Sequence, residues 1–173
     1  MQKLLILCAL EKELPVRENP YSSITVYTGV GKVNAAMMAA FSIKSRRPDM
    51  IINYGTAGSC NKKLSGLVEC GNFIDRDDSG AFNEDTIITT DYNKCVISTG
   101  DNFVTKELNF CDLVDMESYA IAKVCKKTKT EFKCYKYITD YVNSSSMNDW
   151  EEKIGDGYEL FLEQIDDYIK NSV

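Results

Sequence analysis

Short apolar runs alternate along this chain with segments whose apolar residues recur at helical spacing. This alternation is typical of an α/β protein in which a mostly parallel sheet is covered by helices. Strands are predicted near 2–9, 23–28, 50–54, 71–75, 94–98 and 133–139. Helices are predicted over 32–45, 116–127 and 149–170, with room for shorter helical pieces after Glu11 and around 103–109.

Periodicity marks two of these helices most clearly. In 32–45 the residues that share the spacing i, i+3, i+4, i+7 and i+8 are Val33, Ala36, Met37, Ala40 and Phe41. The segment 149–170 carries a similar stripe, which begins at Trp150, although Gly155 and Gly157 weaken its early turns. We therefore predict two amphipathic helices here.

Two polar segments are predicted to be loops. Residues 75–93 are polar and acidic, and residues 143–146 form a flexible joint between the last strand and the last helix. Loops at the carboxyl ends of strands are where α/β proteins usually place their ligands. A plain solvated connection is the alternative for each segment.

Length and composition limit the classes of protein that fit. The 173 residues predict one domain, 1–173, and the contents of 44% hydrophobic and 27% charged residues are those of a soluble globular protein. A net charge of −6 without a basic stripe argues against nucleic acid as a partner. No segment approaches the roughly 18 apolar residues of a membrane helix, and the run Leu4–Leu10 is short for a signal sequence. We expect a cytoplasmic protein that binds neither nucleic acid nor membranes.

The absence of histidine removes several mechanisms at once. A Ser-His-Asp triad, a Cys-His dyad and a His-ligated metal are all excluded. The seven cysteines are scattered without a CxxC pair, which favours reduced thiols over disulfides or a zinc site. Acid–base chemistry must then fall to Asp, Glu, Lys, Tyr or Cys. We expect neither a metal nor a cofactor.

Three acidic residues occupy comparable places although they lie far apart in the chain. Glu13 and Asp140 each follow an apolar strand-like run, and Glu117, in the motif Asp115-Met116-Glu117, stands at the start of a predicted helix. Asp140 could hold a raised pKa at the end of its apolar strand and so donate a proton near neutral pH. Each acid also has an ordinary structural alternative, as a helix-start carboxylate, a helix-dipole partner or an N-cap.

Three glycine-bearing turns follow predicted strands, at 28–32, 53–59 and 98–104. The first precedes a helix whose N–H groups could face a polar ligand, but Val33 after its lysine excludes a Walker loop. Phe103 in the third turn could stack on an aromatic ring, with a core position as the alternative. Tight turns need glycine anyway, so only the set of turns and acids together predicts one ligand site.

The order of these pieces resembles the nucleoside phosphorylase superfamily, most closely the methylthioadenosine/S-adenosylhomocysteine nucleosidases. The matching stretches are Leu5-Ile-Leu-Cys-Ala-Leu-Glu-Lys-Glu13, Tyr27-Thr-Gly-Val-Gly-Lys-Val-Asn-Ala-Ala36, Ile51-Ile-Asn-Tyr-Gly-Thr-Ala-Gly-Ser59, Ser98-Thr-Gly-Asp-Asn-Phe-Val104, Val114-Asp-Met-Glu-Ser-Tyr-Ala-Ile-Ala122 and Ile138-Thr-Asp140. They span the chain in the family's order. The resemblance implies a three-layer sandwich with a mostly parallel mixed central sheet flanked by helices, and a homodimer.

The resemblance also implies roles for the acids. Glu13 would activate the attacking water, and Asp140, supported by the Thr139 hydroxyl, would protonate N7 of the purine. Met116 and Glu117 would hold the ribose. The other positions that the resemblance assigns to substrate binding are Thr56, Ala57, Gly58, Phe103, Val104 and Lys136, the last in place of the family's usual arginine.

These roles amount to a purine nucleosidase that takes a small-molecule nucleoside such as methylthioadenosine or S-adenosylhomocysteine, as in methionine salvage. Asp140 rather than asparagine suits a 6-amino purine, hence adenine. Phosphorolysis would need a phosphate site, and only Arg17 and Arg76 lie near candidate loops, which favours hydrolysis. A phosphate-dependent phosphorylase and a degenerate, non-catalytic nucleoside-binding protein are the alternatives, with a generic α/β protein as the third. The chain is also shorter than usual for this family between its second and fifth strands.

Overall fold

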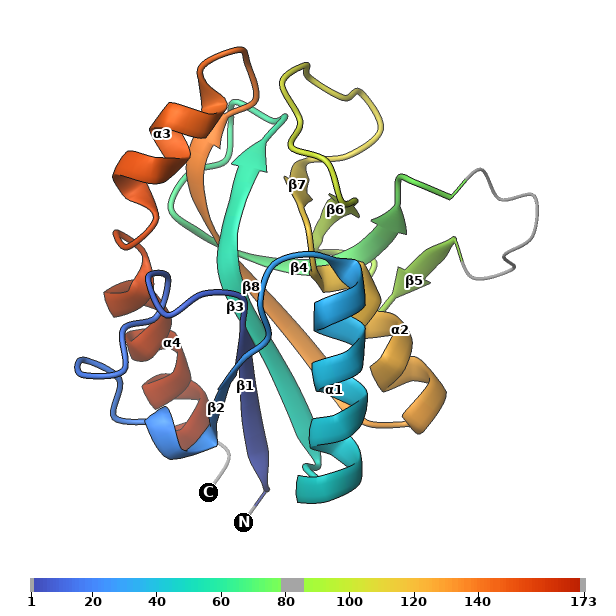
Figure 1. Cartoon of the computed structure of the whole chain (residues 1–173), viewed down its shortest axis with the longest axis vertical. Helices are drawn as coiled ribbons and strands as arrows, with labels where there is room; N and C mark the ends of the chain where they lie inside the picture. The colour runs from blue at the N-terminus through green and yellow to red at the C-terminus, as the bar shows by residue number, and fades with distance from the viewer. Residues whose placement is uncertain (1, 79–85, 172–173) are drawn as a thin grey trace.

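A mixed sheet runs through the middle of the protein, with helices on both sides (Figure 1). The computed structural model describes residues 2–78 and 86–171. Its strands are β1 Leu4–Cys8, β2 Thr25–Tyr27, β3 Met50–Ser59, β4 Leu67–Asp75, β5 Ile87–Thr89, β6 Cys95–Thr99, β7 Leu113–Asp115 and β8 Glu131–Tyr141. Its helices are α1 Lys32–Arg46, α2 Ser118–Thr128, α3 Ser146–Lys153 and α4 Tyr158–Asn171, with a short 3₁₀ turn at Ser22–Ile24.

Strand β8 closes the sheet on itself. The order along the sheet is β2-β1-β3-β7-β6-β4-β5, and β8 pairs in parallel with β3 and antiparallel with β4. The pairs β1–β2, β1–β3, β4–β6 and β6–β7 are parallel, whereas β3–β7 and β4–β5 are antiparallel. The curled half surrounds a core that includes Phe73, Ile97 and Leu113.

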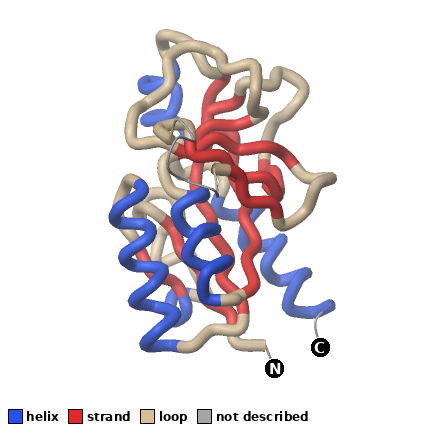
Figure 2. Tube along the Cα trace, turned by 90° about the vertical axis from the view of Figure 1, so that its right-hand side faces the viewer, coloured by secondary structure: helices blue, strands red, loops and turns tan. Residues whose placement is uncertain are grey.

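Alternation along the central strands builds three layers. In β1, Leu5 and Leu7 pack under α1 and α2, whereas Ile6 and Cys8 point to the opposite face and pack against Phe161 of α4. Successive side chains of a strand point to opposite faces, so an unbroken apolar run is what a sheet covered on both sides requires. Figure 2 shows the strands between the helices, with long loops gathered at the end of the molecule away from the N-terminus. The predicted fold class is thereby confirmed.

The predicted strands all form, and β3, β4 and β8 run further than predicted. The predictions missed β5 and β7, whose three residues are too few to show a periodicity. Residues 79–85 of the predicted loop 75–93 lie outside the described residues, but β5 makes the prediction wrong for 87–89. The short helical pieces for which the sequence left room do not form: residues 103–109 are a loop, and turns follow Glu11.

The predicted final helix is two helices. The chain breaks between α3 and α4 around Gly155 and Gly157, two poor helix formers, and at Gly157 it passes close to the ring of Tyr137. A Cβ at Gly157 would lie 2.2 Å from that ring. The predicted joint at 143–146 is confirmed up to Ser145, since α3 begins at Ser146. Among the described residues, no helix is long and apolar enough to span a bilayer.

Candidate active site

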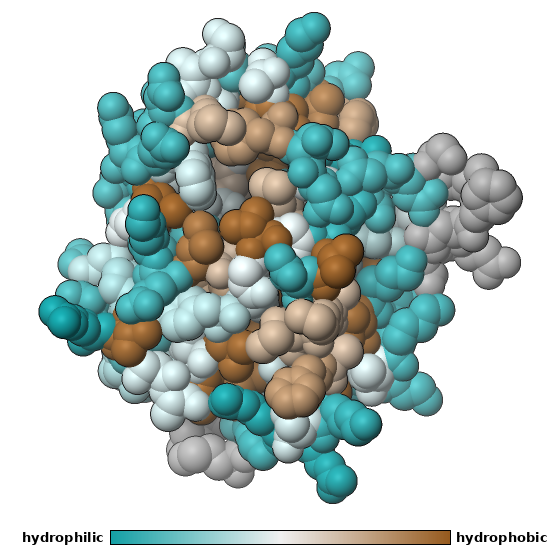
Figure 3. All heavy atoms as spheres, in the orientation of Figure 1, coloured by the Kyte–Doolittle hydropathy of each residue, from teal (hydrophilic) through white to brown (hydrophobic). Residues whose placement is uncertain are grey.

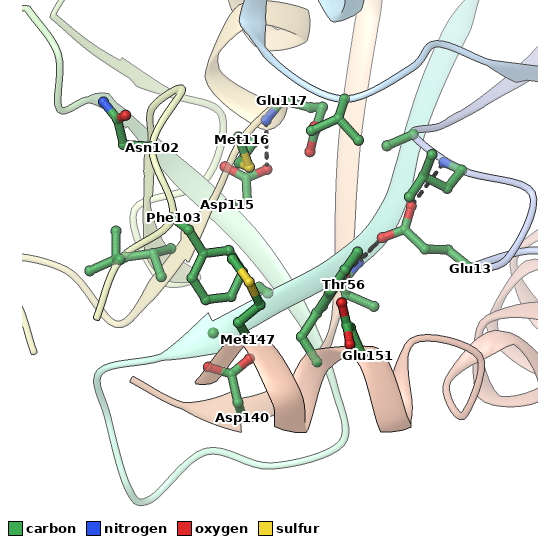
Figure 4. Close-up of a pocket in the computed structure, with 18 of the residues that line it drawn as sticks. Glu13, Thr56, Asn102, Phe103, Asp115, Met116, Glu117, Asp140, Met147 and Glu151 are labelled. Carbon is green, nitrogen blue, oxygen red and sulfur yellow. Dashed lines mark hydrogen bonds between the residues drawn. The ribbon is translucent and has the colours of Figure 1, made fainter. Parts of the chain in front are cut away.

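A cavity of about 360 Å³ opens among β1, β3, β7, β8 and α3, a size that suits a small-molecule ligand (Figure 4). Its wall contains, among others, the predicted residues Glu13, Thr56, Ala57, Gly58, Phe103, Val104, Met116, Glu117 and Asp140. The fold therefore gathers at one place residues that are spread over most of the chain. Lys136 and Thr139 are not in the wall and stand behind it.

Glu13 lies in the turn after β1 and is almost completely buried. Its carboxylate accepts hydrogen bonds from the backbone N–H of Leu10 at 3.1 Å, and from the N–H and the hydroxyl of Thr56 at 2.8 and 2.7 Å (Figure 4). A Cβ at Gly55 would approach the Glu13 carboxylate to 3.2 Å, so glycine leaves room for it. Glu13 is thus an oriented acceptor group at the edge of the cavity.

The two acids of Asp115-Met116-Glu117 have different environments. Asp115 forms an ion pair with Lys136 at 3.0 Å, and the side chains of both are only 1% exposed. It also accepts the N–H of Ser118 at 2.8 Å and so caps the start of α2. Burial disfavours the charged form of Asp115, but the Lys136 ammonium and a hydrogen bond from Thr99 lower its pKa. Asp115 is therefore an ionised structural group.

Glu117 is the residue that leads into α2, and it accepts the backbone N–H of Gly31 at 2.8 Å. Burial raises its pKa to about 7, against the lowering effect of the Lys136 ammonium. The Gly31 backbone has φ +96°, a conformation that side-chain-bearing residues rarely adopt, and this places its N–H toward Glu117. The turn 28–32 thus binds a carboxylate of the protein itself.

Lys136 is fully buried in β8, behind the cavity wall. Burial opposes the charged form of Lys136, but its ammonium pairs with Asp115, and the carboxylates of Asp115, Glu117 and Glu13 raise its pKa. Among the described residues, Lys136 is the one buried cation beside the buried acids Asp115, Glu117 and Glu13. It contributes to the electrostatics of the cavity without lining it.

Asp140 lies inside β8, near its end, rather than after it. The Thr139 hydroxyl donates to one carboxyl oxygen at 2.8 Å, while the other oxygen is buried and lacks a hydrogen-bond partner among the described residues. Burial raises the pKa of Asp140, and the nearby hydroxyls of Thr139 and Ser146 partly offset this rise. A buried polar atom without a partner is costly, so this oxygen is well suited to bond a ligand.

Sequence reasoning missed the wall that α3 contributes. Met147, Trp150 and Glu151 all line the cavity. The apolar stripe of the final helix included Trp150, but its spacing could not show which side of the fold it meets. The indole N–H of Trp150 donates to the Thr56 hydroxyl at 2.9 Å.

Arg76, which the sequence placed near a candidate loop without assigning it a role, also lines the cavity. Its guanidinium donates to the carbonyl oxygens of Ser98, Gly100, Asn102 and Asp115, at 2.5 to 3.0 Å. It therefore holds the third glycine turn, which carries Phe103 and Val104, against β7. In the described chain, no group of three or more acidic or cysteine side chains converges as a metal site.

The cavity places acids on different sides of one space. Figure 4 shows Asp140 at the bottom, Glu13 at the right and Met116 and Glu117 at the top, with the Phe103 ring between Asp140 and Met116. A carboxyl group with a raised pKa at one side and an oriented carboxyl group at another can serve acid–base chemistry on a ligand bound between them.

Comparisons with known proteins give a consistent result. No protein-family model matches the chain. It is 30% identical over 172 residues to the 5′-methylthioadenosine/S-adenosylhomocysteine nucleosidase of Colwellia psychrerythraea, covering 75% of this chain and 71% of that protein. It is 25% identical over 185 residues to the enzyme of the same name from Staphylococcus carnosus, covering 86% and 81%.

Solved structures share the fold. One is a mutant of the Helicobacter pylori 5′-methylthioadenosine/S-adenosylhomocysteine nucleosidase with 5′-methylthioadenosine in the active site. It superposes with a TM-score of 0.86 at 19% identity, covering 99% of both chains. A mutant of the futalosine hydrolase of Helicobacter pylori has a TM-score of 0.86 at 18% identity, covering 99% of this chain and 100% of that one.

Proposed function

The chain belongs to the 5′-methylthioadenosine/S-adenosylhomocysteine nucleosidase family, and from this premise we propose that it hydrolyses the N-glycosidic bond of an adenine nucleoside such as one of these two. One observation carries the proposal. Two buried carboxyl groups, Asp140 and Glu13, lie on different sides of a cavity of about 360 Å³ and have different hydrogen-bond environments. Leaving-group protonation and water activation need two such groups in one site.

Asp140 acts as the general acid. Thr139 holds one of its oxygens, so the oxygen without a protein partner is left to bond N7 of the purine. Burial raises the pKa of Asp140, which favours its protonated form, and Asp140 donates this proton as the bond between the sugar and the base breaks. The proton goes to the leaving base, which departs as neutral adenine.

Glu13 acts as the general base. Donors from Leu10 and Thr56 orient its carboxylate, which takes a proton from water as the water oxygen bonds the anomeric carbon. The sugar carbon becomes oxocarbenium-like in the transition state, so nearby negative charge lowers the barrier. Glu117 accepts hydrogen bonds from the ribose hydroxyls and Met116 packs on the sugar, while Phe103 stacks on the base.

The positions of the arginines support hydrolysis over phosphorolysis. Arg17 is exposed and does not line the cavity, and both terminal nitrogens of Arg76 donate to backbone carbonyls. Lys136 is paired with Asp115 behind the wall. A phosphate dianion in the cavity would thus compete with carbonyls and carboxylates for these cations.

The test is release of free base. Purified protein is incubated with 5′-methylthioadenosine, S-adenosylhomocysteine, adenosine and inosine, with and without phosphate, and products are separated by chromatography. We expect adenine without phosphate; release that strictly requires phosphate would establish a phosphorylase instead. Binding without release from any nucleoside would establish the degenerate alternative. Futalosine is added as a fifth substrate because a structural neighbour is named for it, and a preference of the protein for futalosine would change the substrate but not the chemistry.

A homodimer is part of the same proposal, because α1 leaves an apolar face uncovered. Val33, Met37 and Phe41 follow one another at helical spacing and are 77%, 59% and 64% exposed. Figure 3 shows apolar side chains gathered over α1 on this face of the molecule. Such a patch is typical of an interface. Light scattering should give twice the chain mass for the wild type and the chain mass for Phe41→Glu; a monomeric wild type would refute the dimer.

We place the enzyme in the cytoplasm and in methionine salvage on the same premise. The seven cysteines are all free thiols in the structure, which supports a reducing compartment. Cell fractionation locates the protein. Depletion of the protein from cells tests the pathway: 5′-methylthioadenosine should accumulate, and an unchanged level would refute the assignment to methionine salvage.

A further inference from the structure

Trp150 makes a polar contact that its place on an apolar helix stripe does not predict. It is the single tryptophan of the chain and lines the cavity from α3. Its indole Nε1 lies 2.9 Å from the Thr56 hydroxyl oxygen. The two residues are 94 positions apart in the chain, so only the fold brings them together.

The direction of the hydrogen bonds follows from the groups involved. An indole N–H can only donate, so the Thr56 oxygen accepts from Trp150. The single proton of that hydroxyl is then directed to the Glu13 carboxylate, 2.7 Å away. The same Glu13 oxygen also accepts the Thr56 backbone N–H at 2.8 Å. A chain of donors therefore runs from α3 through Thr56 to Glu13, in a largely buried place where linked hydrogen bonds strengthen one another.

We propose that Trp150 is a positioning residue whose indole N–H holds the Thr56 hydroxyl as a donor to Glu13, and so couples the seating of α3 on the cavity to the orientation of the base. The inference rests on the function proposed above. It assigns the two parts of the side chain different tasks: the ring closes one wall of the cavity, and the N–H acts through Thr56. A purely apolar wall would perform only the first task.

The substitution that separates these tasks is Trp150→Phe, which keeps a flat apolar ring and removes the N–H. We expect kcat to fall about 3- to 10-fold, the range that one buried hydrogen bond is worth, with KM within about twofold. Thr56→Val keeps the backbone N–H to Glu13 and removes the hydroxyl, so it should lower kcat at least as much. The double variant should be no slower than Thr56→Val, because both changes break the same chain.

Met147→Leu is the matched control, since Met147 lines the cavity from the same helix and has no part in this chain of hydrogen bonds. Its effect should combine additively with that of Thr56→Val. Additive losses in kcat for Trp150→Phe and Thr56→Val would overturn the inference, as would an unchanged kcat in Trp150→Phe.

A second measurement does not depend on activity. With one tryptophan, the ¹H–¹⁵N spectrum of the protein contains one indole N–H signal. In Thr56→Val that signal should move upfield and exchange faster with deuterium, and an unmoved signal would show that the hydrogen bond does not exist. Lack of base release from the wild type would overturn the proposed function and with it the coupling, whereas the spectrum still decides the bond.

Discussion

Replacing Glu117 by glutamine should make the protein more stable at pH 8 while weakening it as an enzyme. Glutamine keeps the size of the side chain and a carbonyl oxygen that can accept the Gly31 N–H, a bond of 2.8 Å in the structure. What it removes is a buried carboxylate whose charged form is disfavoured by its surroundings. Burial is the main cause, and the neighbouring carboxylates of Asp115 and Glu13 add to it.

The size of the effect follows from the pKa of Glu117, which rises from 4.5 to about 7 in the folded protein. At about 1.4 kcal/mol for each pH unit, this corresponds to about 3 kcal/mol. Below pH 4.5, the pKa of Glu117 in the unfolded state, the folded and the unfolded protein both bind the proton, and burial of Glu117 costs no stability. As the pH rises through about 7, the unfolded state has already released its proton and the folded state must release one too. The wild type has then lost about 3 kcal/mol of stability, whereas the variant, which has no proton to release, has lost none.

Urea unfolding at pH 4.5 and pH 8 measures the prediction. The free energy of unfolding of Glu117→Gln minus that of the wild type should be about 3 kcal/mol more positive at pH 8 than at pH 4.5. Glu163→Gln, at an exposed position of α4, controls for the loss of one surface charge. Equal differences at the two pH values, or a variant less stable at pH 8, would refute the reasoning. At the same time KM should rise about 10-fold or more, because charged hydrogen bonds to the ribose are lost.

Asp140→Asn should lower base release about 10²- to 10⁴-fold in a steady-state assay, since the general acid is removed; retained turnover would exclude Asp140 from that role. Lys136→Met should cost about 3–5 kcal/mol in urea unfolding, because it leaves Asp115 buried without its partner. Asp115→Asn added to it should recover part of this loss, and a loss below about 1 kcal/mol for the single variant would contradict the ion pair's importance. Gly58→Ala places a Cβ 3.0 Å from the Asp140 oxygen without a partner and 3.2 Å from Val114 and Val142. We therefore expect about 1–3 kcal/mol of destabilisation in urea unfolding and slower turnover. Unchanged stability and turnover would show that these neighbours move aside without cost.

The local pattern of the chain was sufficient for the elements that depend on local periodicity. The apolar spacing of 32–45 predicted α1, although the face of this helix that packs on the sheet carries Ala35 and Ala39 and the predicted stripe with Val33 and Phe41 is exposed. Unbroken apolar runs predicted β1 and the central strands, because burial on both faces of a sheet leaves that mark in any chain. Glu13, Glu117 and Asp140 could be found for a similar reason. Glu13 follows β1, Glu117 directly precedes α2 and Asp140 lies next to the end of β8, and such places recur in a recognisable order.

The tertiary structure alone decided which of two neighbouring acids is ionised and which has a raised pKa. Asp115 and Glu117 are two residues apart, yet one is an ionised partner of Lys136 and the other has a pKa of about 7. The partner comes from β8, and no local spacing can show which of two adjacent acids it meets. The strands β5 and β7, three residues each, exist only through their pairing with longer strands.

The same holds for the wall of the cavity. The stripe on the final helix predicted that Trp150 would be packed, but not that its N–H would reach Thr56 on β3. Helical periodicity depends on residues three and four apart, whereas ion pairs, orphan oxygens and cavity walls depend on contacts between distant segments. The pattern of the chain therefore indicated which acids to consider, and long-range packing determined the charge and the hydrogen-bond partners of each.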